Sequence, residues 1–307
     1  SYAPHVAFWA QRGRALTSEL VGGNREKLSG AECATIATRA IALLPDGHGP
    51  VTMRIDSAYY AVELLQRLRR AQARFTVSVP RNQAIWKTLA QIPDAAWTDA
   101  LEMPGAQVAE TTYRPSGWRH EPLRLVVRRV PFSAQKIADG SLTARRRKTI
   151  HPEQLALALD GQVASVFGYS FILTDLPDDR DAVWVEHFHR HRAQIEERLK
   201  DTKLGQALRH LPSGDINANR VWLTAALLAL NLTAFCCDLC PAAGASGKAP
   251  DDAPLRRAAD TLRRILFCVP ARIIRTARRT ILRLPEGFRH ADVFQATLDA
   301  VYALPPP

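Results

Sequence analysis

Near the start of the chain, the spacing of apolar and polar positions changes from strand-like to helical. Two short apolar runs, residues 5–10 and 15–20, flank a polar link and predict a β-hairpin. Over residues 29–44 the apolar positions take helical spacing, and Ser29 and Glu32 occupy the positions of a capping box. A helix is therefore expected directly after the hairpin.

Strand-like runs return after this helix. Residues 51–55 predict a short strand that ends at Asp56, residues 59–71 a helix, and residues 74–79 a second strand that Pro80 stops. The carboxylate of Asp56 is thus expected at the end of a strand.

The rest of the chain divides into three regions with different residue patterns. Residues 81–181 hold short alternating runs broken by Pro and Gly, which indicate a mostly β insertion. Residues 182–204 predict a strongly patterned helix and residues 216–239 a more apolar one. Gly, Ala, Ser and Pro then dominate a stretch that is typical of a linker, and an Arg-rich tail follows it.

This order of elements predicts an α/β fold. With one further strand in front, it is the order of a ribonuclease-H-like fold, a mixed sheet flanked by helices with its acidic site at the strand ends. The expected parts are a first catalytic segment (1–80), the β insertion (81–181), a helical remainder of the catalytic domain (182–240), the linker (241–254) and the C-terminal region (255–307).

The net charge of the chain predicts that it binds a polyanionic partner. The 307 residues carry 41 Lys and Arg against 30 Asp and Glu, a formal net charge of +11, and basic surfaces gain affinity for phosphates by releasing counterions. Thr224, Asn231 and Thr233 interrupt the longest apolar stretch, which favours a buried helix over a membrane span. Five cysteines without a secretion signal favour reduced thiols, with Cys237 and Cys240 in packing rather than in a zinc site.

The sharpest motif lies in the helix predicted over 182–204. At about 100° per residue, His189, Arg192, Glu196 and Lys203 fall within roughly 60° of one another and form one stripe. An apolar stripe runs beside it, so Glu196 is expected at the edge of the core and Glu197 in solvent. The alternative interpretation of the motif is a solvated helix with ordinary charge pairs along its surface.

The spacing of these four residues resembles a known signature. Two, three and six residues separate His189, Arg192, Glu196 and Lys203, as in the Tyr, Arg, Glu, Lys signature of bacterial insertion-sequence transposases of the DDE type. Residues 53–60, around Asp56, are similar to the strand end that carries the second aspartate of those enzymes. His189 departs from the family, which usually has Tyr there.

The resemblance implies a metal-dependent polynucleotidyl transferase. Asp56 and Glu196 would be catalytic residues and ligands of Mg²⁺ or Mn²⁺, with two ions expected in the intact enzyme. His189, Arg192 and Lys203 would bind DNA, Arg as a fork and Lys as a point charge. In the family the first aspartate lies on a strand before the hairpin, so that strand is expected upstream of Ser1, and the chain by itself is expected to be inactive.

Further basic and aromatic residues are candidates for contacts with DNA. The basic run Arg145, Arg146, Arg147 and Lys148 and the arginines of the tail are suited to phosphates. Trp97 and Trp118 of the insertion are candidates for stacking on a flipped base, although core packing is the commoner use of Trp.

Two other groups of residues suggest different chemistry and are weaker candidates. His187, His189 and His191 invite a zinc site, but only the first and last share a helix face. Asp175 follows a strand-like run and resembles a catalytic carboxylate in position, although Asp-Leu-Pro predicts a turn.

The function that these features predict is cleavage and strand transfer of the DNA of an insertion sequence. The partners would be transposon ends and target DNA, bound by a homodimer in the bacterial cytoplasm. The alternative is a truncated, non-catalytic DNA-binding protein derived from a transposase. A strand ending in Asp upstream of Ser1 would favour the enzyme over this alternative.

Overall fold

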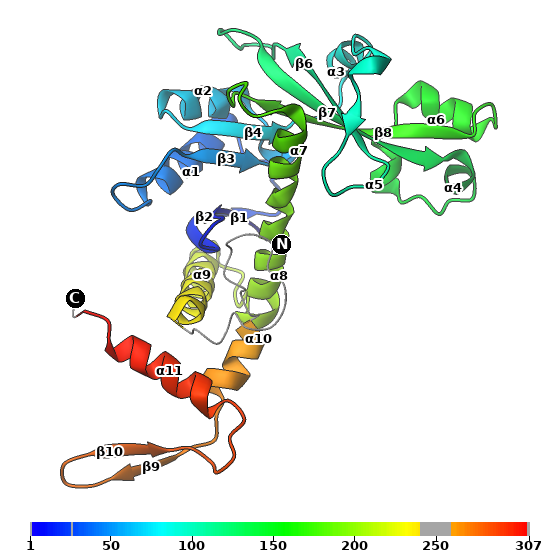
Figure 1. The fold of residues 1–307 in the computed structure, drawn as a ribbon. Helices are drawn as coiled ribbons and strands as arrows, with labels where there is room; N and C mark the ends of the chain where they lie inside the picture. Colours follow the sequence, from blue (N-terminus) through cyan, green and yellow to red (C-terminus); the bar gives the residue numbers. More distant parts are fainter. Residues whose placement is uncertain (1, 26, 240–258, 306–307) are drawn as a thin grey trace. The chain divides into compact units, whose positions relative to one another are not determined.

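The computed structural model describes residues 2–25, 27–239 and 259–305, which fall into two compact units (Figure 1). One unit consists of residues 1–24 and 194–307, and the other of residues 25–193. We describe each unit by itself. The linker expected over 241–254 lies outside the described residues.

The unit of residues 25–193 is built on a six-stranded mixed sheet in the order β3-β4-β8-β7-β6-β5. Its strands are β3 (Thr52–Ile55), β4 (Arg74–Ser78), β5 (Thr98–Asp99), β6 (Gln107–Tyr113), β7 (Leu123–Ser133) and β8 (Ser165–Thr174). Only β3 and β4 pair in parallel, and the other neighbours in this sheet are antiparallel. The strands of the expected insertion therefore extend the same sheet that carries Asp56.

Helices flank this sheet, which confirms the mixed α/β class and is consistent with a ribonuclease-H-like fold (Figure 1). They are α1 (Gly30–Ala42), α2 (Val62–Arg70), α3 (Gln83–Leu89), α4 (Ala134–Ala138), α5 (Ala144–Arg147), α6 (Pro152–Leu159) and α7 (Ala182–Arg190). The capping box expected at α1 is present, with the Ser29 hydroxyl and the Glu32 carboxylate each bonded to the other residue's backbone N–H. A capping box supplies acceptors for backbone N–H groups at the helix N-terminus that have no partner within the helix.

The two faces of β4 are used differently, as the alternation of side chains along a strand requires. Phe75 and Val77 are fully buried, and Phe75 meets the ring of Trp118 edge to face. Thr76 and Ser78 point to the opposite face, where both hydroxyls bond to His189 of α7. One face of β4 therefore belongs to an apolar core and the other to a polar contact with α7.

The second unit joins the N-terminal hairpin to the helices after residue 193. Its elements are β1 (Tyr2–Trp9), β2 (Arg14–Gly22), α8 (Gln194–Gly205), α9 (Ile216–Leu239), α10 (Ala259–Leu262), a π-helical turn (Arg263–Phe267), β9 (Arg272–Arg275), β10 (Thr280–Arg283) and α11 (Ala291–Tyr302). Leu20 of the hairpin packs in one cluster with Leu223, Leu227 and Leu230 of α9. The hairpin predicted from the sequence is confirmed, with β1 and β2 paired antiparallel.

Among the described residues, α9 is the one helix whose length and composition would allow it to cross a membrane, with a mean hydropathy of 1.6 over its most apolar window. One of its faces is buried against the hairpin, and the Asn231 side chain bonds to both the N–H and the C=O of Ala15 at 2.8 Å. Satisfying a polar side chain in this way is what a helix packed in a protein core requires.

The helix expected over 182–204 is interrupted. A 3₁₀ turn, His191–Ala193, separates α7 from α8. The His191 ring bonds through Nδ1 to the carbonyl of His187, and the His191 backbone N–H bonds to His189 instead. Because the side chain competes for the carbonyl one turn back, the regular ladder stops here. The unbroken helix for which the single stripe was calculated is therefore not present.

Candidate active site

The carboxylate of Asp56 lies at the C-terminal end of β3, as the sequence predicts. It caps the following 3₁₀ turn, because Oδ1 accepts a hydrogen bond of 2.7 Å from the Ser57 N–H. The side chain is 49% exposed, and its contacts among the described residues all involve Oδ1. Oδ2 is therefore the atom that a cation could reach without breaking the cap.

Arg192, the arginine of the signature, lies at this strand end. Its guanidinium Nη2 lies 3.6 Å from Asp56 Oδ1. A second contact holds α7 against β3. Arg54 of β3 donates to the carbonyl of Phe188 at 3.2 Å and lies over the Phe188 ring. The strand that carries Asp56 and the helix that leads into the signature are thus joined by two arginines, one from each side.

His189, which was expected to bind DNA, is buried. Its ring lies between two hydroxyls of β4, with Nδ1 2.8 Å from Thr76 Oγ1 and Nε2 2.9 Å from Ser78 Oγ. Only 2% of the residue is exposed. Burial, together with the nearby Arg192, Arg54 and Arg128, lowers the pKa of His189 to about 3, so the ring is neutral at pH 7. The geometry favours a role in holding α7 on β4 over a direct contact with DNA.

A buried ion pair beside His189 was missed by sequence reasoning. The Glu186 carboxylate, with 1% of its side chain exposed, lies 2.5 Å from Arg128 of β7 and 3.4 Å from Arg190. Glu186 is three residues before His189, so the two side chains share one face of the helix. This spacing is the sequence feature that could have predicted that Glu186 lies beside His189. Together with Val185, these residues form the side of α7 that packs on the sheet.

Glu196 and Lys203 belong to α8, in the other unit. Glu196 is exposed and not at the edge of the core, where it was expected from the sequence, and its distance from Asp56 stays a prediction. Among the described residues no three His, Cys, Asp or Glu side chains form a group that could hold a metal ion. The zinc site considered for the His187 cluster has no such support, since His187 instead pairs with Glu102 at 3.0 Å.

Asp175 lies at the wrong end of the sheet to join Asp56. Its Oδ1 accepts a hydrogen bond of 2.8 Å from the Phe75 N–H, near the beginning of β4, whereas Asp56 follows the end of the parallel strand β3. Burial raises the pKa of Asp175 above its usual range. This carboxylate therefore fixes the start of β4 and is separate from the candidate site.

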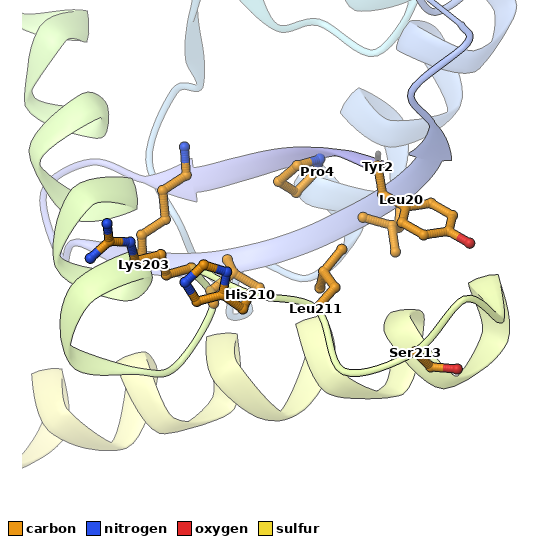
Figure 2. Close-up of a pocket in the computed structure, with 9 residues that line it drawn as sticks. Tyr2, Pro4, Leu20, Lys203, His210, Leu211 and Ser213 are labelled. Carbon is orange, nitrogen blue, oxygen red and sulfur yellow. The ribbon is translucent and has the colours of Figure 1, made fainter.

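Lys203 lines a pocket of about 470 Å³ in its own unit (Figure 2). Arg209 and His210 line it as well, and Tyr2 and Pro4 of β1 contribute from the hairpin. Figure 2 shows Lys203 and His210 toward one end and Ser213 toward the other. Three basic side chains around one hollow are suited to an anionic group such as a phosphate.

The expected basic run, Arg145 to Lys148, coincides with the short helix α5. Arg145, Arg146 and Lys148 are exposed. Arg147 is partly buried and its guanidinium donates to the carbonyl of Ile137. Three of the four side chains are therefore available to a phosphate backbone, and the fourth anchors the helix.

The two tryptophans proposed for base stacking differ in their surroundings. Trp118 is 4% exposed, lies against Phe75 and donates from Nε1 to the Glu121 carbonyl at 2.8 Å. It is a core residue with no face open to a base. Trp97 is partly exposed, with the Arg129 guanidinium 4.2 Å above its ring centre. Of the two, only Trp97 is exposed enough to meet a base.

The site can be compared with known proteins. No curated protein matches the chain at a significant level. A family model, described as transposase DDE domain group 1, matches residues 1–306. This match covers nearly the whole chain, including the strand end of Asp56 and the helices with Arg192 and Glu196, and so the chain belongs to the transposase DDE domain family.

Proposed function

We propose that the protein is a transposase that cuts and joins the DNA of its own insertion sequence in a metal-dependent reaction. The observation that carries this proposal is the pairing of Arg192 with Asp56 at the end of β3. A carboxylate and a guanidinium from the two motifs of the family signature meet there, within a chain that the family model matches almost entirely.

Asp56 and Glu196 are the residues that we assign to the metal site. Bound Mg²⁺ or Mn²⁺ would supply activation of the attacking oxygen and neutralisation of the leaving one. Hard divalent cations prefer carboxylate oxygens and retain waters, and the half-exposed Asp56 with its open Oδ2 fits that preference. Glu196, an exposed carboxylate of the signature, would serve as the third acid of the site.

Arg192 would change partner when DNA binds. In the absence of DNA its guanidinium neutralises Asp56. A phosphate of the substrate offers two oxygens to the guanidinium fork, which is a stronger acceptor set than one half-exposed carboxylate oxygen. Arg192 would thus position the phosphate beside the carboxylate that it leaves.

Other basic residues would hold the DNA outside the acidic site. Lys203, with Arg209 and His210, fits one backbone phosphate, and the exposed Arg145, Arg146 and Lys148 of the other unit are suited to phosphates of the duplex as well. The partners would be the two transposon ends and the target, held by a homodimer in the bacterial cytoplasm.

The test is cleavage of labelled element-end DNA by the protein expressed from its complete reading frame. We expect cleavage with Mg²⁺ or Mn²⁺, its loss in Asp56→Asn and Glu196→Gln, and its retention in Glu197→Gln, which removes the neighbouring carboxylate. Asn at position 56 keeps an oxygen to cap Ser57, so a loss would reflect the charge. Cleavage that persists in both Asp56→Asn and Glu196→Gln would refute the assignment.

A further inference from the structure

The C-terminal β-ribbon, strands β9 and β10 with the turn between them, is a surface that the proposed catalytic site does not use. Over residues 272–283 it contains five arginines and no acidic residue. These are Arg272, Arg275, Arg278, Arg279 and Arg283, and every one of them is exposed. Within the described part of the chain, none of the five side chains has an acidic partner.

The register of the ribbon sets like charges side by side. Arg272 is directly opposite Arg283, and like charges directly opposite on two strands are destabilising. At the other end, the turn is closed by backbone and hydroxyl bonds between Thr276 and Arg279, which fixes Arg278 and Arg279 at the tip. The ribbon therefore holds its positive charges together at a cost to its own stability.

The apolar residues of the ribbon do not explain why it forms. Ile273 is 61% exposed, and Leu282, directly opposite it, is 48% exposed. A two-stranded hairpin without a covering layer is marginal in water. The exposed apolar pair and the unneutralised arginines both indicate a surface that a partner covers.

We infer that this ribbon is a contact site for duplex DNA, separate from the acidic site. The charge of the ribbon complements a phosphate backbone, and the major groove of B-DNA, about 12 Å wide, admits a two-stranded β-ribbon. The arginines would contact phosphates on the groove walls, and Ile273 and Leu282 would meet apolar edges of sugars and bases. This inference rests on DNA being the substrate, as the proposed function states.

The test compares salt dependences of duplex binding by the full chain. The probe is a labelled duplex of arbitrary sequence, titrated at several salt concentrations. Each arginine that neutralises a phosphate contributes about 0.9 to the slope of log affinity against log salt. We expect Arg272→Gln with Arg283→Gln to lower that slope by about 2, and the double change to Lys to keep it.

The matched control removes the same charge elsewhere. Arg70→Gln with Lys87→Gln changes two exposed residues of α2 and α3 and should leave the slope unchanged. An unchanged slope in the ribbon variant, or an equal fall in the control, would overturn the ribbon assignment while leaving DNA binding intact. A parent chain that fails to bind any duplex would instead refute the proposed function as well.

A membrane surface is the other polyanion that the test must separate. Vesicles of phosphatidylglycerol serve as the second probe. Loss of vesicle binding in the ribbon variant with an unchanged slope on DNA would overturn the inference. Thermal unfolding of the variant should show no loss of stability, since the opposed pair of like charges has been removed.

Discussion

The guanidinium of Arg192 and the carboxylate of Asp56 lie 3.6 Å apart although 135 residues separate them in the chain. The contact joins the strand end that resembles the family's second-aspartate segment to the arginine of the family signature. Both residues lie in the unit of residues 25–193. Arg192 and Asp56 are both partly exposed, at 28% and 49% of their side chains, so a phosphate or a cation can compete for either one. We interpret the pair as the proposed site before DNA or metal binds.

Replacing Arg192 should affect DNA and metal in opposite directions. Arg192→Gln removes a positive charge beside Asp56, so Mn²⁺ affinity without DNA should rise, because the cation no longer competes with a guanidinium. The slope of duplex affinity against salt should fall by about 1, as expected for one lost phosphate contact. Paramagnetic resonance of Mn²⁺ and duplex titration measure the two effects, and a fall in Mn²⁺ affinity would argue against the exchange of partners.

His189 should make the stability of the protein depend on pH above the range where carboxylates titrate. The folded ring stays neutral down to a pKa of about 3, whereas an unfolded His takes up a proton near its ordinary pKa of about 6.5. Between these values the unfolded state binds more protons, so stability is present above about pH 6.5 and is lost as the pH falls.

The size of this effect is about 1.4 kcal/mol per pH unit at most, and about 1.6 kcal/mol between pH 6.5 and 5, because the unfolded ring is only half protonated at pH 6.5. Urea unfolding of the parent and of His189→Gln over that range measures it. The variant should be less stable at neutral pH and should have a flatter profile. His48→Gln, a change at an exposed histidine, should leave the profile as it is. Parallel profiles for parent and His189→Gln would contradict this account.

Breaking the buried pair of Glu186 and Arg128 should be costly. Arg128→Met would leave a carboxylate with 1% of its side chain exposed without its nearest partner, and removing one partner of a buried pair costs about 3 kcal/mol. Arg25→Met, which breaks an exposed pair with Glu32, should cost much less. Denaturant unfolding of both variants decides the matter, and equal costs would show that Arg190 alone compensates Glu186.

The sequence predicted local elements better than long-range packing. The hairpin, the capped helix α1, the strand that ends at Asp56 and the bounds of α9 follow from periodicity and caps, and the structure confirms them. The interruption at His191 depends on which carbonyl one side chain bonds, which no periodicity encodes. The ribbon β9–β10 was not predicted, because Arg-Ile-Ile-Arg and Thr-Ile-Leu-Arg do not alternate between apolar and polar residues.

The candidate site shows the same division. The position of Asp56 at a strand end was predictable from its neighbours, because a short apolar run and the break after it define the end. The burial of His189 and Trp118 was not, since each depends on β4, a strand distant in sequence that supplies Thr76, Ser78 and Phe75. A polar or aromatic residue reveals its partner only once the chain is folded.

The central claim is that Asp56 and Glu196 belong to one shared metal site, and Mn²⁺ binding tests it most directly because it requires no catalysis. Paramagnetic resonance should show tight Mn²⁺ binding by the parent, the protein expressed from its complete reading frame. We expect a loss of affinity of about tenfold or more in both Asp56→Asn and Glu196→Gln, as expected for removal of one charged ligand worth about 1.4 kcal/mol or more. Glu197→Gln should bind Mn²⁺ like the parent. Binding by Glu196→Gln that equals that of the parent, while Asp56→Asn loses the ion, would contradict the claim of a shared site.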